Sequence, residues 1–111
     1  MIEKRIRDHL LTKLAVGIYL EYPETPPTKF VLFEKTGSSK ENHLHSATFA
    51  FQSYAPSLYE AAELNELVKA AVESLIETQD VSKAKLNSDY NFTDTTTKEY
   101  RYQAVFDIYH Y

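Results

Sequence analysis

The sequence predicts an α+β fold in which a mostly antiparallel sheet of about four to five strands packs against two helices. Apolar residues recur at helical spacing in two segments, one at the N-terminus and one in the centre of the chain. Most other segments alternate apolar and polar residues, as half-buried strands do. Because helices and strands do not alternate regularly, a parallel sheet built from strand-helix-strand units is not expected.

Composition narrows the class of protein. The 111 residues, of which 43% are hydrophobic and 25% charged, predict a single globular domain over residues 1–111. The chain has no cysteine, which excludes disulfides, thiolate zinc sites and a cysteine nucleophile. A net charge of −4 argues against a protein that wraps nucleic acid with a basic face. No segment is apolar enough for a signal peptide or a membrane span, so we expect a cytoplasmic protein without a membrane partner.

The N-terminal segment is expected to form a helix followed by a short strand. Apolar residues at every fourth position from Ile2 to Leu14 predict an amphipathic helix of about three to four turns that ends near Gly17, with Leu11 widening its apolar stripe. Residues 16–22 are rich in β-branched and aromatic side chains and predict a strand, which Pro23 ends. The proline-rich residues 23–29 form a stiff connector, because proline suits neither a helix interior nor a central strand.

A β-hairpin with a polar tip is expected next. Residues 30–35 and residues 43–54 both have strand composition. Between them, residues 36–42 are polar and typical of turns, so they predict a loop that projects from the sheet.

The central helix has a clear start signal. Pro56 leaves the preceding strand, and Ser57 is placed to cap the helix. Glu60 lies three residues later, where it can reach back to the amide of Ser57 and complete a capping box. The helix should therefore begin at Leu58 and run for about 20 residues. Its buried face is expected to contain Leu64, Leu67, Val68, Ala71, Val72, Leu75 and Ile76, and its exposed face Glu60, Glu63, Asn65, Glu66, Lys69 and Glu73.

A second hairpin is expected to close the chain. Residues 84–94 have strand composition, residues 94–98 form a polar turn, and residues 99–111 alternate more regularly than any other segment. One face of the last strand is expected to be buried and carries Tyr100, Tyr102, Ala104, Phe106 and Ile108, and the other face carries Glu99, Arg101, Gln103 and Asp107.

The histidines are the first candidates for a metal site. His43 and His45 are two residues apart on an expected strand, so their side chains share one face. No third ligand follows at suitable spacing, and the sequence favours solvated or edge-pairing histidines over a zinc site. His9 lies on a charged helix face and His110 lies near the C-terminus, and both are weaker candidates.

No catalytic arrangement is evident. Asp89 and Asp94 flank one arm of a hairpin, and Glu63 and Glu66 lie about one helical turn apart, but nothing marks a pocket that would separate their pKa values. Ser57 lacks the neighbouring glycines of a nucleophile elbow, and capping explains it better. The sequence therefore predicts no catalytic residue, no cofactor and no metal.

Three stretches carry a family resemblance: "EKTG" at residues 34–37, "YAPSLYEA" at residues 54–61 and "RYQAVF" at residues 101–106. Together with the N-terminal helix and the proline-rich connector, they make the chain similar, over nearly its whole length, to the tail-terminator and tail-completion proteins of long-tailed bacteriophages and prophages. These stretches are structural signatures, so the resemblance bears on fold and role more than on single functional residues.

The resemblance implies a structural protein of the virion without enzymatic activity or cofactor. Such subunits form a ring, commonly a hexamer, on the end of the tail tube that faces the head. The implied partners are other copies of the chain, the major tail tube protein and the head-connector protein, with DNA passing through the lumen without specific binding. The implied location is the virion tail or neck, and the host cytoplasm during assembly.

Interface residues do not follow from the resemblance, so we take them from the polar loops. The expected contacts with partners are Ser38, Ser39, Lys40, Glu41 and Asn42 in the first hairpin, and Asp94, Thr95, Thr96 and Thr97 in the second. Tyr109 and Tyr111 fit a core role and an interface role equally well. The alternatives are another neck component, such as a head-closure or adaptor-contacting protein, and a small ligand-binding or enzymatic domain with an apolar pocket.

Overall fold

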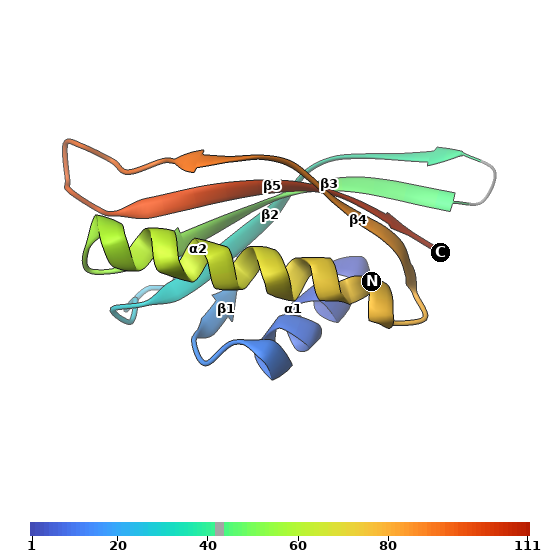
Figure 1. The fold of residues 1–111 in the computed structure, drawn as a ribbon, viewed down its shortest axis with the longest axis horizontal. Coiled ribbons are helices and arrows are strands. Elements are labelled where there is room, and N and C mark those ends of the chain that lie inside the picture. The colour runs from blue at the N-terminus through green and yellow to red at the C-terminus, as the bar shows by residue number, and fades with distance from the viewer. Residues whose placement is uncertain (42–43) are drawn as a thin grey trace.

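The computed structural model describes residues 1–41 and 44–111, and it places both helices on one face of a sheet (Figure 1). The helices are α1 (Ile2–Lys13) and α2 (Leu58–Glu73), and a 3₁₀ turn, η1 (Ser74–Glu77), extends α2. The strands are β1 (Gly17–Tyr19), β2 (Phe30–Glu41), β3 (Leu44–Tyr54), β4 (Val81–Asn91) and β5 (Arg101–His110). The predicted α+β class is confirmed.

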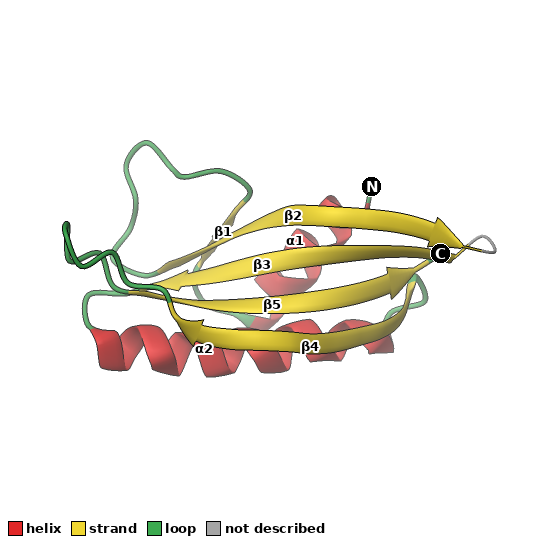
Figure 2. Ribbon diagram, turned by 90° about the horizontal axis from the view of Figure 1, so that it is seen from above, coloured by secondary structure: helices red, strands yellow, loops and turns green. Residues whose placement is uncertain are grey.

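The sheet has the strand order β1-β2-β3-β5-β4 (Figure 2). Its β2–β3, β3–β5 and β5–β4 pairs are antiparallel, as predicted, whereas β1 lies parallel to β2. The strand predicted over residues 16–22 is only three residues long, because β1 meets β2 only from Phe30 to Leu32. The connector then leaves the sheet and returns to start β2.

The polar loop predicted at residues 36–42 is wrong over most of its length. β2 continues to Glu41, and Ser38 and Ser39 pair with Ala47 and Ser46 of β3. Backbone hydrogen bonds do not depend on side-chain polarity, so a partner strand of matching length extends β2 into polar sequence. Asn42 and His43 lie outside the described residues.

The start of α2 is confirmed at Leu58. The Ser57 hydroxyl accepts a hydrogen bond from the Glu60 amide at 3.2 Å, which is the predicted cap. The Glu60 carboxylate accepts from the Ser57 hydroxyl at 2.9 Å rather than from the Ser57 amide. This hydrogen bond between the two side chains replaces one of the two bonds of the expected capping box and stabilises the same turn.

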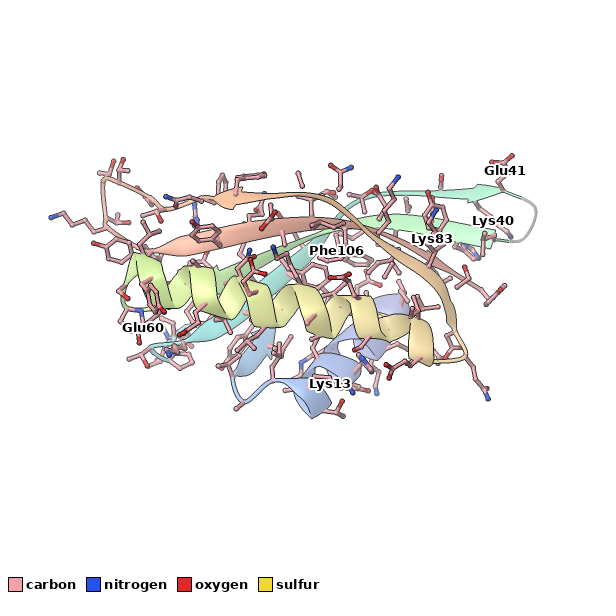
Figure 3. All side chains as sticks on the ribbon, in the orientation of Figure 1. Lys13, Lys40, Glu41, Glu60, Lys83 and Phe106 are labelled. Atoms are coloured by element: carbon pink, nitrogen blue, oxygen red, sulfur yellow. The ribbon has the colours of Figure 1, made fainter. Side chains whose placement is uncertain are left out.

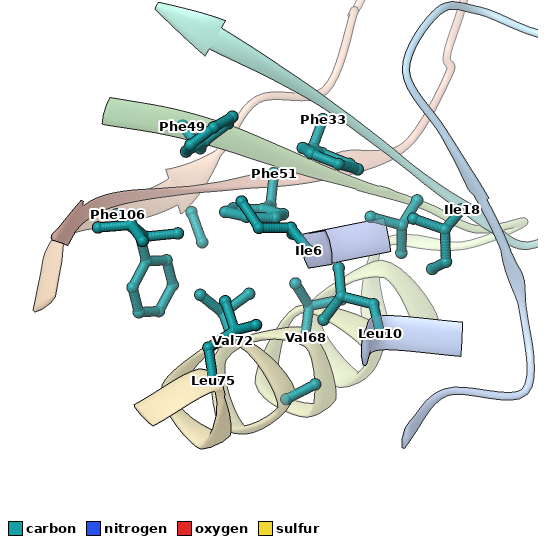
Figure 4. Packing of buried hydrophobic residues seen from close by; sticks show 14 of the residues in the cluster. Ile6, Leu10, Ile18, Phe33, Phe49, Phe51, Val68, Val72, Leu75 and Phe106 are labelled. Carbon is teal, nitrogen blue, oxygen red and sulfur yellow. The ribbon is translucent and has the colours of Figure 1, made fainter. Parts of the chain in front are cut away.

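The core lies between the sheet and the two helices (Figure 4). Phe33, Phe51 and Phe106 meet across three strands, with the Phe33 and Phe51 rings stacked at 5.2 Å and the Phe51 and Phe106 rings edge to face at 5.9 Å. The helices fill the space beneath these rings with the aliphatic residues Ile6, Leu10, Val68, Val72 and Leu75. Burial of this aromatic and aliphatic surface is the main stabilising contribution in a chain without disulfides.

Several predicted burial assignments in α2 and η1 are wrong. Leu67 and Ile76 are 58% and 57% exposed, although both were expected in the core. Asn65 is only 1% exposed, because its side-chain amide donates to Asp89 of β4 at 3.0 Å. The buried face of α2 is therefore rotated toward β4 and is narrower than the apolar stripe in the sequence.

The alternation predicted for the last strand holds for Ala104, Phe106 and Ile108, which are buried. Gln103 is buried as well, against expectation, because Gln52 and Tyr90 surround it with hydrogen bonds. Tyr100 precedes β5, and Tyr100 and Tyr102 are half-buried rather than core residues.

Candidate interaction surfaces

The two edges of the sheet are the most extended unpaired features of the described residues. β1 covers β2 only from Phe30 to Leu32, so the outer side of β2 from Phe33 to Glu41 has no partner strand among them. On the opposite side, β4 pairs only with β5. Unpaired edges present backbone donors and acceptors to a further strand, and the two edges differ in sequence and length.

Opposite charges lie along these two edges on the same face of the sheet, the face turned away from the helices, which we call the open face. The ladder register places Glu34 and Glu41 on the open face of β2, and Lys83 and Lys85 on the open face of β4. All four side chains are exposed, and none forms an ion pair with another described residue. Figure 3 labels Glu41 and Lys83. One edge is thus acidic and the other basic on this face.

Hydrogen bonds between side chains make the open face stiff. Gln52 donates to Gln103 at 2.9 Å, Gln103 donates to Tyr90 at 2.6 Å, and Tyr54 donates to Gln52 at 2.9 Å. This ladder crosses β3, β5 and β4 on the open face. Cross-strand pairs of this kind fix strand register, so the two edges are held at a constant separation.

The structure brings three of the predicted interface residues together at one end of the open face. Ser39, Glu41 and Tyr109 line a shallow hollow of about 310 Å³ with Leu44 and Ser46. Ser38 and Lys40 alternate to the other face of β2, so they do not join this group. Asn42 falls outside the described residues. The first predicted interface is therefore the side of a strand end rather than a loop.

Asp94, Thr95, Thr96 and Thr97 form a tight turn at the opposite end of the molecule from the β2–β3 hairpin (Figure 1). The Asp94 carboxylate accepts hydrogen bonds from the amides of Thr96 at 3.0 Å and Thr97 at 3.4 Å. These bonds lower the pKa of Asp94. The turn predicted here is confirmed, and its side chains are not close to those of the first hairpin.

The proline-rich connector is tied to this second turn. Tyr22 donates a hydrogen bond to the Glu99 carboxylate at 2.5 Å, and this bond raises the pKa of Tyr22 to about 12. The ring of Tyr22 also packs edge to face on Phe30 and Tyr54, with centroids 5.7 and 5.9 Å apart. The connector and the turn therefore form one rigid end of the molecule.

The two C-terminal tyrosines, Tyr109 and Tyr111, differ in their exposure and contacts. Tyr109 is half-buried on the open face, with the Lys83 ammonium 5.5 Å from its ring centroid. Tyr111 is 73% exposed, and its backbone amide donates to the backbone carbonyl of Asp80 at 3.0 Å. Neither ring belongs to the core, which leaves both available for contact with a partner.

The histidines form no metal site within the described part of the chain. His45 and His110 pair across β3 and β5, and their rings stack at 5.2 Å. No group of three potential metal ligands was found among the described residues. His43 lies outside them, so the predicted sharing of a face by His43 and His45 stays a prediction.

One contact that sequence reasoning missed has the atoms of a nucleophile and a base. His9 Nε2 lies 2.7 Å from Ser74 Oγ, and these residues are 65 positions apart. The Ser74 hydroxyl also contacts the Ala71 carbonyl at 2.6 Å, as helix-terminal serines commonly do. Burial lowers the pKa of His9. This pair links α1 to the end of α2. No local sequence pattern predicts the contact, because the two residues lie far apart in the chain.

A larger hollow than the one at the strand end lies between the helices. It measures about 560 Å³ and is lined by Lys13, Leu14, Ala15, Val16, Lys29, Glu60, Glu63, Leu64, Glu66 and Leu67. A smaller hollow beside it adds Ala70, Ala71 and Ser74. We call this surface the α1–α2 groove. It is open along one side, and its floor is mostly apolar.

No helix in the described residues is long and apolar enough to cross a membrane. Comparison of the chain with protein-family models and with curated proteins finds no match.

Proposed function

We propose that this chain is a structural subunit of a phage or prophage tail terminator, which forms a ring on the tail tube and joins it to the head. The observation that carries the proposal is the pair of unlike sheet edges that have no partner strand among the described residues, the outer side of β2 beyond Leu32 and the outer side of β4. A ring requires two different complementary surfaces on each subunit, because its contacts run head to tail. The residues that resemble tail-terminator proteins support the same role.

The edge charges favour contact between copies of the chain. In a ring, β4 of one subunit approaches the outer side of β2 of the next, which brings Lys83 and Lys85 near Glu34 and Glu41. Opposite charges across such a contact select the correct partner edge and disfavour β4 meeting β4. Bulges interrupt both edge strands, between Lys35 and Gly37 and at two places in β4, and blunted edges limit uncontrolled pairing.

The ends of the subunit suit contacts with two further partners. The molecule is 44 Å long and about half as wide, with the Ser39, Glu41 and Tyr109 hollow at one end and the Asp94 turn at the other. In the proposed ring, one end meets the major tail tube protein and the other meets the head connector. Rigid ends of this kind are where binding residues are placed on structural subunits.

In this proposal, DNA passes through the ring without binding to it. The net charge of −4 disfavours attraction of phosphates to the subunit. A lumen that does not attract DNA allows the genome to slide through. A different neck component remains the runner-up, because it would use the same two edges. A ligand-binding role is the second alternative, because the α1–α2 groove has the size of a small-molecule site.

The decisive experiment images tails that assemble with and without this gene in its phage or prophage. Overlong or uncapped tubes in its absence support a terminator. Tails of normal length that do not join heads indicate a later joining step. Normal infectious particles would contradict both roles.

A second experiment addresses the ring contact. The double substitution Lys83→Glu and Lys85→Glu should prevent ring formation on tails while leaving the subunit folded and soluble, because both side chains are exposed. Adding Glu34→Lys and Glu41→Lys to the same chain should restore rings, since each edge then meets its reversed counterpart. Failure of the fourfold variant to restore rings, with the subunit still folded, counts against the edge contact.

A further inference from the structure

The α1–α2 groove has two walls of opposite charge. Lys13 lies on the α1 wall and Glu63 on the α2 wall, and both are exposed. Neither forms an ion pair with another described residue, whereas the neighbouring Glu60 and Glu66 are already paired with Lys29 at 3.3 Å and Lys69 at 3.0 Å. Lys13 and Glu63 are thus the charges that the groove presents to an occupant. Figure 3 shows Lys13 on the helical side of the molecule, away from the sheet.

Between these walls the surface is apolar. Leu67 is 58% exposed, and Leu14 and Ala70 lie in the same strip of the groove. Exposed leucines that cluster over a hollow, with charges at its rim, are typical of an interaction surface. The sequence placed Leu67 in the core, so its exposure on this groove is a feature that only the fold reveals.

We propose that the α1–α2 groove is a self-association surface, in which two copies of this chain pack groove to groove about a two-fold axis. A two-fold contact repeats each interaction, so Lys13 of each copy meets the partner's Glu63. The leucine strip of each copy then covers the floor of the other groove. The contact uses neither sheet edge, so it is independent of the proposed ring.

The charge balance of the helices identifies a second copy as the occupant. α1 carries four basic and two acidic side chains, a net charge of +2. α2 with η1 carries five acidic and one basic side chain, a net charge of −4. A purely basic partner segment would face repulsion from Lys13, and a purely acidic one from Glu63. A second copy related by a two-fold axis places α1 over the partner's α2 and satisfies both walls.

The test measures self-association by sedimentation over a wide range of protein concentration. The chain has a mass of 12.8 kDa, so a dimer has twice that mass. We expect the unaltered chain to dimerise, and Leu67→Glu, Lys13→Glu and Glu63→Lys each to weaken the dimer by about tenfold or more. Glu24→Lys, an exposed charge reversal in the connector, is the matched control and should leave the dimer unchanged.

Mixing variants separates contacts between copies from contacts within one copy. In an equimolar mixture of Lys13→Glu and Glu63→Lys chains, each heterodimer pairs a doubly acidic groove with a doubly basic one. The mixture should therefore dimerise when neither variant does so alone. Salt at about 0.5 M should weaken this heterodimer, because salt screens the attraction between exposed charges. Circular dichroism of each variant checks that it is folded.

Three outcomes would overturn the proposal: a monomer at every concentration, a dimer that Leu67→Glu leaves intact, or a mixture that stays monomeric. If the chain is monomeric but Leu67→Glu blocks phage assembly, the groove binds a different protein. The Lys83→Glu and Lys85→Glu variant should dimerise normally. A chain that dimerises but forms no rings would contradict only the proposed ring contact. A chain that forms rings but does not dimerise would contradict only the proposed groove contact.

Discussion

Lys69 Nζ lies 2.9 Å from Asp89 Oδ2 and joins the middle of α2 to the edge strand β4. The same carboxylate oxygen accepts a hydrogen bond from Asn65 at 3.0 Å. Both partners come from α2, so one carboxylate positions β4 beneath the helix. Among the described residues, β4 pairs on one side with β5, and Asp89 is the β4 side chain that hydrogen bonds join to α2.

Replacing Asp89 with Asn should therefore destabilise the protein near neutral pH. The bonds from Lys69, and then from Asn65, lower the pKa of Asp89 below its ordinary value of 3.8. The contribution is present above that value and is lost as the pH falls through the lowered folded pKa. We expect Asp89→Asn to lower the free energy of unfolding by about 1 kcal/mol at pH 7.

Urea denaturation at several pH values checks this prediction. The difference between Asp89→Asn and the unaltered chain should shrink as the pH falls below 3.8. Glu73→Gln removes an exposed carboxylate from the same helix and should change stability by less than about 0.5 kcal/mol. A difference that stays constant across this pH range would show that the charge of Asp89 is not what matters.

The N-cap of α2 should make a measurable contribution to the free energy of unfolding. Ser57→Ala removes the hydroxyl that accepts from the Glu60 amide, and it should lower the free energy of unfolding by about 1 kcal/mol. Ser57→Thr keeps a hydroxyl that can accept from the Glu60 amide and donate to the Glu60 carboxylate, so it should retain most of the stability. Equal stability of the alanine and threonine variants in thermal unfolding would refute the capping role.

Leu75 and Ile76 are adjacent and similar in volume, yet they are 1% and 57% exposed. Leu75→Ala should cost about 2 to 5 kcal/mol, because it leaves a cavity against the sheet. Ile76→Ala should change the free energy of unfolding by less than about 0.5 kcal/mol. Chemical denaturation of the two variants side by side tests the register of η1, and similar losses would mean that the helix end is rotated from the position described here.

The elements that local sequence determines were predicted well. Ser57 and Glu60 are three residues apart, and the cap they form depends only on that spacing. The alternation of Ala104, Phe106 and Ile108 likewise reports their shared buried face directly. Such features need no knowledge of what packs against them.

The features that were missed depend on distant partners. Asn65 can be buried because the carboxylate of Asp89 accepts a hydrogen bond from its side-chain amide, and Asp89 lies 24 positions later in the sequence. Residues 36–41 form a strand because β3 runs beside them. The hollow formed by Ser39, Glu41 and Tyr109 requires the register of β2 with β3 and of β3 with β5, so no local pattern predicts that these three candidates meet while Ser38 and Lys40 turn away.

Two histidines should make the stability of the protein depend on pH near neutrality. Burial lowers the pKa of His9, and a nearby Lys13 adds to this effect while Glu77 opposes it. Burial also lowers the pKa of His110. The unfolded chain therefore binds protons first, at the ordinary histidine pKa of 6.5, and draws the equilibrium toward unfolding as the pH falls.

We expect the free energy of unfolding to decrease as the pH falls through 6.5 toward the lowered folded pKa values. The double variant His9→Gln and His110→Gln should flatten this slope, because neither glutamine titrates. Ser74→Ala is the matched control: it removes the hydroxyl 2.7 Å from His9 but no titrating group, so the slope should persist. Urea denaturation between pH 5 and pH 8, a range that spans ordinary histidine titration at about 6.5, provides the measurement. An unchanged slope in the double variant would assign the pH dependence to other groups.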